Sequence, residues 1–574
     1  MGWMSCYLVS CWIWCSLLSM VNNEELLELG GPRDCKNARF VPGYNLGGEG
    51  FDVVKMERKK SYVIDMEKWN IGNGSCKMYS NPYLNNAKQK IPAAVEFWRT
   101  LPKCSMKVSS KIYESSEALV QESTSSISNN WRAGLDVMFK GLGSLGGTHS
   151  REAKFGMKKS KEDNFSFTKH VVQCSFYSYQ IVSSPPVQRN FLKALQSLPR
   201  KYDPRSYKRI IDKFGTHYTT GVDLGGRMKA VTAIKTCKAS LSGLTDTAVK
   251  DCLDVEASGT YKSATLNTES RYCQSLKQKM STNEKFSSMF NDRQTEIIGG
   301  NINGEDLLFS KNSHPYALKK WLNSLKTIPD VVTYTLHPLH TVLNQRHPAR
   351  KGLKKAVENY IRDNALKKVC SRSCKIGHRS RGRDCCACVC EGSQTVLSNC
   401  CPTAPGLATL RVFNLRANGL YGDTFSKTDG YVEITYRSTF KRTAVITDND
   451  NPRWRESFEY GPVKLSTSQK ITFKVYDEDT PWNRDLLGQC SFDLRRGRKT
   501  KVCYFQYGTF FFSYDVKCAP NLQGSHCTTY KPSPMAAPLA KIFQSRNGIL
   551  AKDMWKLQAA QNYSNNLSFE GYYE

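Results

Sequence analysis

The spacing of hydrophobic residues changes midway through the stretch Tyr207–Gly226. The first half repeats its apolar side chains at three- and four-residue intervals, namely at Tyr207, Ile210, Ile211 and Phe214. This period predicts a helix with one buried face, and Gly215 ends it, as a glycine after the last periodic residue often does. The second half alternates and predicts a strand that runs into Gly225–Gly226; its members are Tyr218, Thr220, Val222 and Leu224. Two glycines there would let the strand bend sharply or let another backbone approach closely.

Two longer segments, Trp131–Val172 and Leu253–Gly300, share one pattern. In each, a stretch rich in Lys or Arg lies between two stretches in which apolar and polar residues alternate. The first alternates over Trp131–Lys140, and again after its Lys-rich middle at Phe165 and Phe167. The second ends at Ile297–Ile298 and opens with one apolar or small side: Leu253, Val255, Ala257, Gly259 and Tyr261. We therefore expect strand, helix and strand in each segment. Solvated helices between strands explain this pattern, and so does a helix that can extend into an amphipathic strand with one face toward lipid.

The pattern changes again from Leu407 to about Lys517, where short alternating strands are separated by turns at regular intervals. This arrangement predicts an all-β sandwich. The clearest strands are Leu410–Val412, Tyr431–Ile434 and Ile471–Val475.

Acidic residues gather in the connections between these strands, at Asp423, Asp429, Asp477, Asp479 and Asp485. Ca²⁺ takes roughly six to eight oxygen ligands, which carboxylates on adjacent loops can supply. Local turn chemistry explains any one of these aspartates, but it explains their joint spacing poorly. Tyr421 and Trp482 share the same connections, where amphipathic aromatic rings could enter the interface of a bilayer. A role for Trp482 in the core of the sandwich remains an alternative.

The chain has 574 residues, a length that predicts three or four domains. Its 82 Lys and Arg residues against 51 Asp and Glu residues give a net charge of +31. Such a charge suits an anionic partner: lipid head groups, an acidic storage matrix or nucleic acid. The sequence contains no helix-turn-helix, zinc-finger or ribonucleoprotein motif, so we do not expect nucleic acid as a partner.

The N-terminus has the features of a secretion signal. Cys6–Ser19 is an apolar run that is too short to span a bilayer comfortably and is typical of a signal peptide. We expect residues 1–21 to form this signal, and no later apolar run approaches the length of a membrane-spanning helix. Glycosylation motifs agree with passage through the secretory pathway; they begin at Asn73, Asn164, Asn562 and Asn566.

Most of the 22 cysteines lie beyond this signal, and in a secreted chain they predict disulfides. The signal contains three of them, which leaves an odd number and therefore at least one cysteine without an intramolecular partner. Cysteines are densest between Cys370 and Cys401. So short a stretch cannot build a hydrophobic core, and we expect disulfides to hold it together.

The stretch Tyr207–Gly226 resembles the hallmark of the membrane-attack-complex/perforin family. The matching residues are Tyr207, Phe214, Gly215, Thr216, His217, Tyr218, Gly225 and Gly226. The segment FVPGYNLGGEGFDVV near the N-terminus resembles the same family, although an ordinary helix–turn–strand with a core histidine also explains the residues at Tyr207–Gly226. The resemblance implies an α+β domain with a bent antiparallel central sheet. It further implies that the two segments above are helical clusters that unfold into transmembrane β-hairpins.

The remaining modules resemble parts of the same architecture. Cys370–Cys401 resembles the EGF-like module of this family, and the aspartate spacing, with TDGYVEI and NPRW, resembles a C2 domain. This order of modules is similar to the perforin branch of the family, whereas complement components surround the first domain with other modules. The expected domains are a signal peptide (1–21), a pore-forming domain (22–368), an EGF-like module (369–403), a C2 domain with a C-terminal disulfide region (404–530) and a tail (531–574).

The resemblance also implies a disulfide pattern. Around the EGF-like module it implies Cys370–Cys386, Cys374–Cys388, Cys390–Cys400 and Cys237–Cys401. Elsewhere we expect Cys35–Cys76, Cys104–Cys174, Cys490–Cys503 and Cys518–Cys527. The fate of Cys252, Cys273 and Cys385 stays open.

The resemblance implies a function without catalysis: calcium-dependent binding to phospholipid, assembly into a large homo-oligomeric pore, and insertion of a β-barrel that kills the target cell. Ca²⁺ is the implied cofactor, and the implied route leads from secretory granules to the target-cell membrane. We find no Gly-x-Ser-x-Gly elbow and no His-Glu-x-x-His zinc motif, so we do not expect an enzyme. The alternatives are a non-lytic, calcium-dependent adhesion protein of the same build and a secreted calcium-dependent lipase.

Overall fold

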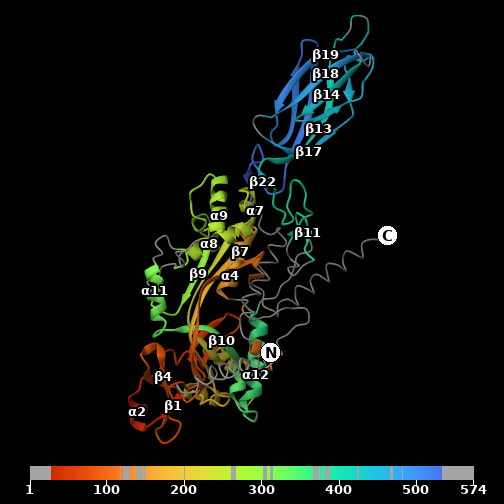
Figure 1. Cartoon of the computed structure of the whole chain (residues 1–574). Coiled ribbons are helices and arrows are strands. Elements are labelled where there is room, and N and C mark those ends of the chain that lie inside the picture. The colour runs from red at the N-terminus through yellow and green to blue at the C-terminus, as the bar shows by residue number, and fades with distance from the viewer. Residues whose placement is uncertain are drawn as a thin grey trace, which may run out of the picture.

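The computed structural model describes residues 27–532, with gaps of which the longest are 120–128, 137–146, 260–266, 302–306, 310–314, 366–373 and 382–387. The molecule is elongated, with a β-sandwich at one end, a small sheet at the other end, and a large sheet with its helices between them (Figure 1). The expected signal and almost all of the expected tail lie outside the described residues. Within the described part of the chain, no helix is long and apolar enough to cross a membrane.

Three long antiparallel strands form the main part of the large sheet: β6 (Val95–Tyr113), β7 (Phe165–Ile181) and β8 (His217–Lys235). Beyond β8 the sheet ends in two short strands, β2 (Glu49–Asp52), which pairs with β8, and β3 (Glu57–Tyr62), which pairs with β2. Two further strands also pair with β8, namely β9 (Arg293–Ile298) and β10 (Asp330–Pro338). This is the antiparallel central sheet of the predicted α+β class.

Strand β8 changes its partner at Gly225–Gly226. Before the two glycines it pairs with β10, and after them it pairs with β9. The ladder between β7 and β8 shifts its register at the same level, between Ser175 and Tyr177. The strand expected to end at the glycines therefore continues to Lys235, and the glycines mark an irregular level of the sheet.

The predicted helix is α6 (Pro204–Phe214), and its buried residues are Tyr207, Ile210, Ile211 and Phe214. Asp203 caps its N-terminus by accepting a hydrogen bond from the Ser206 N–H at 2.8 Å, and Gly215 ends it with a φ of 80°. The chain around it forms α5 (Arg189–Gln196), the 3₁₀ helix η3 (Leu339–Val342) and α12 (Ala349–Asn364). Tyr207 packs against Gly352 of α12, where any Cβ would collide with the tyrosine ring.

In its described part, the first alternating segment contains the α-helix α4 (Arg151–Ser160) before it enters β7. The strand expected at Trp131–Lys140 is wrong for its described part, because Trp131 lies in the 3₁₀ helix η2 (Asn129–Arg132) and no strand follows as far as Asp136. Trp131 is buried and Leu135 packs against the same core, so both side chains cover the sheet instead of alternating. Residues 137–140 lie outside the described residues.

The second segment is helical where a strand was expected. Leu253 lies inside α8 (Asp246–Gly259), which follows α7 (Thr236–Leu241) and precedes α9 (Asn267–Lys279) and α10 (Phe286–Met289). Leu253 and Ala257 lie one helical turn apart and are both fully buried, Leu253 in a cluster with Phe286. In this fold, packing of one helical face therefore outweighs the alternating pattern. Tyr261 lies outside the described residues, and the expected closing strand is present as β9.

The two ends of the large domain carry smaller units. At the lower end of Figure 1 lie α2 (Pro32–Asn37), the 3₁₀ helix η1 (Pro82–Leu84) and a three-stranded sheet of β1 (Leu27–Gly30), β4 (Cys76–Asn81) and β5 (Ala87–Lys90). Helix α11 (Pro315–Ser324) lies beside the central sheet (Figure 1). The cysteine-rich module forms the short hairpin of β11 (His378–Arg379) and β12 (Cys388–Val389).

The predicted sandwich packs two antiparallel sheets around an apolar core that includes Phe473, Phe510 and Phe512. One sheet contains β13 (Leu407–Asn418), β16 (Arg453–Trp454), β17 (Phe458–Lys464), β20 (Gly497–Tyr504) and β21 (Thr509–Cys518). The other contains β14 (Gly430–Tyr436), β15 (Thr439–Arg442), β18 (Lys470–Thr480) and β19 (Asn483–Asp493). A last hairpin, of β22 (Leu522–Gln523) and β23 (Thr529–Tyr530), lies between the sandwich and the large domain (Figure 1).

Candidate membrane-binding and membrane-insertion sites

Four of the five expected calcium ligands lie toward the end of the sandwich that is farthest from the central sheet (Figure 1). They are Asp429, Asp477, Asp479 and Asp485. Neighbouring strands bring them together, because Gly430 on β14 is opposite Asp477 on β18, and Asp477 is opposite Asp485 on β19. The fifth ligand, Asp423, and the aromatic residue Trp482 lie outside the described residues.

Asp477 is the buried centre of this group, with 2% of its surface exposed. Its Oδ1 accepts a hydrogen bond from the Asp429 N–H at 2.6 Å, and the backbone of Gly422 packs so closely on Oδ2 that a Cβ there would overlap it. Asp429 Oδ1 in turn accepts a hydrogen bond from the Asp448 N–H at 2.7 Å. The acidic side chains therefore hold three loops of the sandwich in place.

The loop Asp448–Asp450 is a part of this site that our sequence analysis missed. Asp450 Oδ1 accepts hydrogen bonds from both the N–H and the hydroxyl of Thr428, each at 3.1 Å. These bonds position the residue immediately before Asp429. The Asp-Asn-Asp run that immediately precedes the NPRW motif was the available signal.

The donor chemistry of this end suits Ca²⁺, because it consists of carboxylate oxygens on adjacent strands and loops. Asp477 and Asp485 face each other directly across an antiparallel pair, where two like charges destabilise a sheet unless a cation neutralises them. Among the residues that the structure describes, no group of three potential ligands lies close enough to hold a metal ion. The assignment of Ca²⁺ to these four aspartates and Asp423 therefore stays a prediction.

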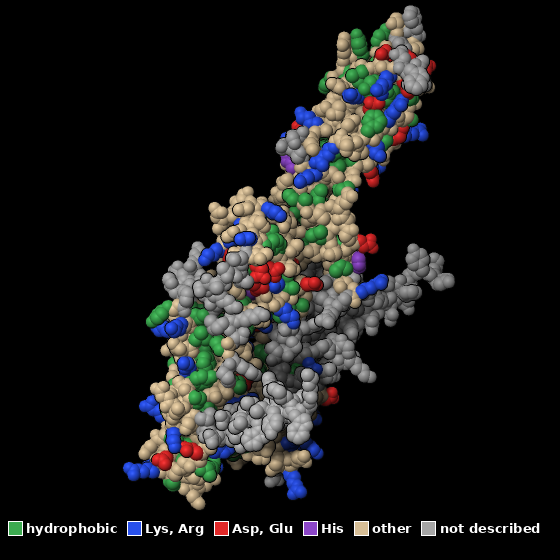
Figure 2. All heavy atoms as spheres, viewed as in Figure 1, with side chains coloured by type: hydrophobic (Ala, Val, Ile, Leu, Met, Phe, Trp, Pro, Cys, Tyr) green, Lys and Arg blue, Asp and Glu red, His purple; other side chains and the backbone are tan. Residues whose placement is uncertain are grey.

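An aromatic pair lies beside the aspartates. Tyr421 is 52% exposed, and its ring centroid lies 5.9 Å from that of Tyr507, which is 48% exposed. Tyr507 lies in the turn between β20 and β21, far from Tyr421 in sequence, and so was missed; close packing of Gly508 on the backbone of Gly419 brings the two turns together. Lys and Arg side chains are spread over the visible face of the sandwich and of the large domain (Figure 2).

His217 of the family motif is fully buried at the start of β8. Its Nε2 lies 2.6 Å from the carbonyl oxygen of Trp131, which can only accept, so Nε2 carries the proton. Nδ1 then accepts a hydrogen bond from the Thr216 hydroxyl at 2.7 Å. Burial lowers the pKa of His217 to about 3. The histidine therefore links the first alternating segment to the central sheet as a neutral group.

The glycine pair of the motif lies at a close backbone approach. A Cβ at Gly225 would overlap the carbonyl oxygen of Cys174 on β7, and one at Gly226 would lie 2.5 Å from Trp321 of α11. Trp321 is 1% exposed, and its Nε1 donates a hydrogen bond to the carbonyl of Gly299 at 2.9 Å. Glycine is thus required at this level of the sheet in the fold described here.

A buried carboxylate holds helix α4 of the first segment on the sheet. Glu152 is 5% exposed, its Oε1 lies 2.5 Å from Lys229 Nζ on β8, and its Oε2 lies 3.5 Å from Lys169 Nζ on β7. Lys229 Nζ also lies 2.8 Å from Glu296 on β9. The contact of α4 with the sheet is therefore an ionic network in a poorly hydrated place.

A second carboxylate does the same for helix α8 of the second segment. Asp254 Oδ1 lies 2.9 Å from Nε2 of the fully buried His170 on β7, and its Oδ2 accepts a hydrogen bond from Ser110 on β6 at 2.6 Å. Lys250 Nζ completes the cluster at 2.8 Å. We call Glu152 and Asp254 the two anchors. The sequence contained no signal for them, because each is one acidic residue in a polar stretch.

The structure forms seven of the eight expected disulfides: Cys35–Cys76, Cys104–Cys174, Cys237–Cys401, Cys374–Cys388, Cys390–Cys400, Cys490–Cys503 and Cys518–Cys527. The eighth, Cys370–Cys386, lies outside the described residues, as does Cys385. Cys252 and Cys273, which had no assigned partner, bond to each other between α8 and α9.

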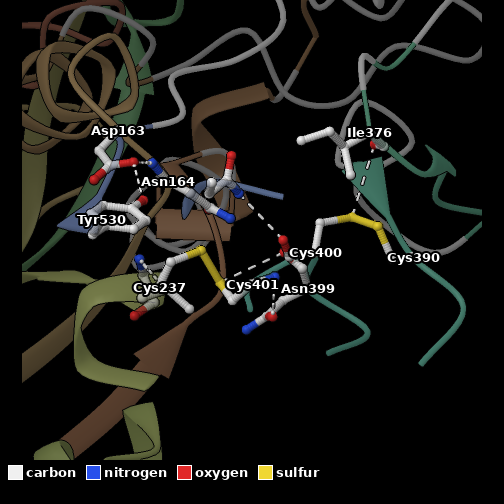
Figure 3. Close-up of a disulfide and its surroundings, with 12 residues drawn as sticks. Asp163, Asn164, Cys237, Ile376, Cys390, Asn399, Cys400, Cys401 and Tyr530 are labelled. Atoms are coloured by element: carbon white, nitrogen blue, oxygen red, sulfur yellow. Dashed lines mark hydrogen bonds between the residues drawn. A yellow bond between two sulfur atoms is a disulfide. The ribbon is translucent and has the colours of Figure 1, made fainter. Parts of the chain in front are cut away.

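The Cys237–Cys401 bridge lies at the junction of the modules (Figure 3). It joins α7, at the end of β8, to the last cysteine of the cysteine-rich module. Beside it, the hydroxyl of Tyr530 in the C-terminal hairpin donates a hydrogen bond to Asp163 Oδ1 at 2.7 Å (Figure 3). The C-terminal hairpin and the cysteine-rich module are thus tied to the large domain beside the start of β7 and the end of β8.

The glycosylation motifs differ in their surroundings. Asn73 is exposed in a turn, whereas Asn164 is half-buried beside the buried residues Phe165 and Ser166. The remaining two, Asn562 and Asn566, lie outside the described residues.

Comparisons with known proteins match this architecture module by module. The family described as MAC/Perforin domain matches residues 42–369, the family Perforin-1-like, EGF domain matches 369–403, and the C2 domain family matches 408–507. Perforin-1 of Rattus norvegicus is 36% identical over 510 residues, which cover 87% of this chain and 92% of that protein. Perforin-1 of Homo sapiens is 36% identical over 512 residues, with the same coverage. A solved structure described as "Structure of a C2 domain" is 35% identical, covers 19% of this chain and 98% of that chain, and has a TM-score of 0.18.

The bent antiparallel sheet, the disulfide module and the β-sandwich define a modular protein in which a MAC/Perforin domain precedes an EGF-like module and a C2 domain. The predicted fold class is thereby confirmed. The chain belongs to the MAC/Perforin family, and nearly its whole length is similar to Perforin-1. The resemblance that the motif at Tyr207–Gly226 indicated is confirmed as well.

Proposed function

We propose that this protein is a calcium-dependent, pore-forming cytolytic protein that binds target-cell phospholipid, oligomerises and inserts a transmembrane β-barrel. One observation carries the proposal. The helices of each segment lie in the chain between the two strands of one antiparallel pair: α4 lies between β6 and β7, and α8, α9 and α10 lie between β8 and β9. Each segment could therefore lengthen an existing antiparallel pair without any change of topology.

Attachment to the membrane belongs to the C2 domain in this proposal. Ca²⁺ held by Asp423, Asp429, Asp477, Asp479 and Asp485 would neutralise the carboxylates and offer its remaining coordination positions to lipid phosphate. Tyr421, Trp482 and Tyr507 would then meet the interfacial zone of the bilayer. The net charge of +31 favours anionic lipid, and it also suits storage with an acidic matrix in secretory granules before release.

Insertion belongs to the segments Trp131–Val172 and Leu253–Gly300. A backbone that crosses hydrocarbon must satisfy its own hydrogen bonds, so these polar segments can cross only as strands of a closed barrel. Two hairpins from one copy are too few to enclose a water-filled lumen, so many copies must assemble. No covalent bond is broken in this sequence of steps, and the protein acts without catalysis.

Release of a trapped dye from liposomes, measured with and without Ca²⁺, tests the proposal. A pore former releases dye only with Ca²⁺ and produces no free fatty acid. Binding without release would identify a membrane-adhesion protein, and release accompanied by fatty acid would identify a lipase. Either of these outcomes would contradict the proposal.

The first prediction concerns Asp429, which lies between Asp477 and Asp448 in the acidic group. Asp429→Ala removes one ligand and one loop contact, so we expect calcium-dependent co-sedimentation with liposomes to be lost at Ca²⁺ concentrations that saturate the unsubstituted protein. Asp493→Ala is the matched control, because Asp493 is exposed at the opposite end of the same sheet. Unchanged calcium-dependent binding of Asp429→Ala would remove Asp429 from the site.

A further inference from the structure

The pairing of β8 with β9 has a simple register. It runs without a bulge from Arg227 opposite Ile298 to Thr232 opposite Arg293, and each step forward on β8 is one step back on β9. The ladder extends one step further, because the Ala233 N–H donates a hydrogen bond to the Asp292 carbonyl at 2.8 Å. Beyond this point the chain leaves the sheet and forms the helices of the second segment.

Extended at the same register, this ladder would bring two cysteines face to face. Cys252 lies 20 residues after Thr232, and Cys273 lies 20 residues before Arg293. These are the two cysteines that already form a disulfide between α8 and α9, with their Cα atoms 5.6 Å apart. The same bond therefore fits the helical arrangement and the extended hairpin.

The type of pair also fits. Along an antiparallel ladder, opposite residues alternate between hydrogen-bonded and non-hydrogen-bonded pairs. Ala233 and Asp292 form a pair of the first type, because the Ala233 N–H donates to the Asp292 carbonyl. Cys252 and Cys273 would consequently form a non-hydrogen-bonded pair, the type in which side chains lie closer together. The central sheet already holds a disulfide between residues directly opposite each other, Cys104 on β6 and Cys174 on β7.

The residues just beyond the disulfide sort into two faces at this register. On one face, Leu253, Val255 and Ala257 would lie opposite Tyr272, Ser270 and Thr268, and this face carries no charge. On the other face, Asp254 would lie opposite Arg271, and Glu256 opposite Glu269. A transmembrane strand needs an uncharged face toward lipid and tolerates charges toward a water-filled lumen. The anchor Asp254 would thus exchange a contact with His170 for a contact with Arg271.

We propose that Cys252–Cys273 stays closed while the second segment unfolds into a hairpin, and that it sets the register in which this hairpin extends β8 and β9. The uncharged face defined above then meets lipid, and the face of Asp254 and Glu256 meets the lumen. This inference rests on the proposed pore-forming function and adds to it a register and a residue-by-residue orientation. Without the crosslink, the two strands could pair one residue out of step, which would turn the charged face toward lipid.

Single cysteine substitutions at residues 268–272, each labelled with the environment-sensitive fluorophore NBD, test the orientation. These positions on α9 are exposed or half-buried in the resting fold, so they can be labelled before insertion. On liposomes with Ca²⁺ we expect blue-shifted, brighter emission at positions 268, 270 and 272, and aqueous emission at 269 and 271. The unsubstituted protein, treated with the same reagent, corrects for labelling of a native thiol.

The inference would be overturned if positions 269 and 271 gave the blue-shifted emission instead, or if the emission varied with the period of a helix. In the same samples, dye release separates this failure from failure of the proposed function. If the labelled proteins release dye but their NBD emission does not alternate from one residue to the next, the proposed register is wrong and pore formation stands. If the unsubstituted protein releases no dye with Ca²⁺, pore formation itself is contradicted.

Peptide mapping tests the crosslink directly. Membrane-inserted protein is alkylated and digested without reduction, and we expect Cys252 and Cys273 to be recovered in one linked pair of peptides. Recovery of the two cysteines as alkylated peptides from the inserted fraction would overturn the proposal. Soluble protein, mapped in parallel, provides the control in which the bond is closed.

Discussion

His217 shows what one residue of the family motif contributes physically. The imidazole is neutral, donates to the carbonyl of Trp131 and accepts from Thr216, so both of its nitrogens are satisfied without water. Protonation would place a charge in the core and remove the acceptor on Nδ1. A histidine in this position therefore stabilises the fold only as long as it stays uncharged.

The second prediction is that stability falls with acidification because of this histidine. The pKa of His217 is about 3 in the folded protein and 6.5 as its ordinary value, so between these values the unfolded chain binds the proton and the folded chain does not. The contribution of neutral, buried His217 to the free energy of unfolding is complete above pH 6.5 and is lost as the pH falls toward 3. From pH 6.5 to pH 5 this costs about 2 kcal/mol of unfolding free energy.

Urea unfolding of the unsubstituted protein and of His217→Gln, each at pH 7.5 and at pH 5.0, tests this prediction. We expect the pH-dependent difference to shrink by about 2 kcal/mol in His217→Gln, whatever the substitution does to stability at neutral pH. His378→Gln is the control, because His378 is exposed. An identical pH-dependent difference in all three proteins would contradict the assignment.

At the scale of elements, the glycine pair and α11 act together. Gly225–Gly226 is the level at which β8 exchanges β10 for β9, and Trp321 of α11 packs against the second glycine. We propose that the central sheet opens at this level when the two segments extend. A side chain at Gly225 would already disturb the resting fold, so loss of dye release in Gly225→Val would not by itself show that the sheet opens there.

The third prediction therefore concerns Gly226→Ala. The new methyl group would lie 2.5 Å from side-chain atoms of Trp321 and Leu325, and α11 must shift to make room for it. Such overpacking costs about 1–3 kcal/mol of stability. Thermal unfolding should show a lower midpoint for Gly226→Ala than for Gly392→Ala, since Gly392 has open space around it. Equal midpoints would mean that α11 shifts to accommodate the methyl group without a loss of stability.

Helices α4 and α8 each place one carboxylate against the strands of the central sheet. Glu152 and Asp254 lie against basic or polar groups of β6, β7 and β8; Glu152 is buried, whereas 27% of the Asp254 side chain is exposed. Removing one partner of a buried ionic group leaves the others unpaired and is more costly than losing a surface pair. In the proposed insertion, breaking the contacts of these anchors would contribute part of the free energy barrier.

The fourth prediction is that Asp254→Asn loosens α8 locally. We expect faster amide hydrogen exchange in α8, equivalent to a loss of about 1–3 kcal/mol of local opening free energy. Asp251→Asn is the matched control on the same helix, because 47% of the Asp251 side chain is exposed and its ion pair is with Lys250 of the same helix. If both variants exchange at the rate of the unsubstituted protein, Asp254 does not hold the helix.

At the scale of the whole molecule, the residues proposed for membrane attachment and those proposed for insertion lie at different distances from the junction between the modules. The aspartates lie at the far end of the sandwich, whereas Cys237–Cys401 and the contact of Tyr530 with Asp163 tie the near end to the large domain (Figures 1 and 3). The junction lies beside the helices that the proposal requires to unfold. A substitution in one region should therefore affect one step and leave the other step intact.

The fifth prediction uses this separation. Ser110→Cys with Asp254→Cys replaces a 2.6 Å hydrogen bond between β6 and α8 with a possible disulfide. Under oxidising conditions we expect dye release to be blocked while calcium-dependent binding to liposomes persists, and mild reduction should restore release. The two single substitutions control for loss of the anchor. Full release with the crosslink closed would show that the second segment does not unfold.

Local sequence patterns were sufficient for much of this protein. The period of Tyr207–Phe214 predicted α6, the family motif around Gly215 led to the fold class, and alternation after Leu407 predicted the sandwich. In these places the local pattern and the tertiary burial agree, because one face of each element packs against a core. The disulfides of the cysteine-rich module could be anticipated only through the family resemblance, because many connectivities fit the same spacing.

The tertiary structure alone decided the state of Leu253–Gly259. Its alternating residues suit a strand, but burial of Leu253 and Ala257 on one helical face and the contact of Asp254 with His170 make it a helix. The anchors, the pairing of Cys252 with Cys273, and the neighbouring rings of Tyr421 and Tyr507 likewise join residues that are distant in sequence or have no local signal. A periodic pattern records which faces an element can present; which face is buried depends on the partners that the rest of the chain brings to it.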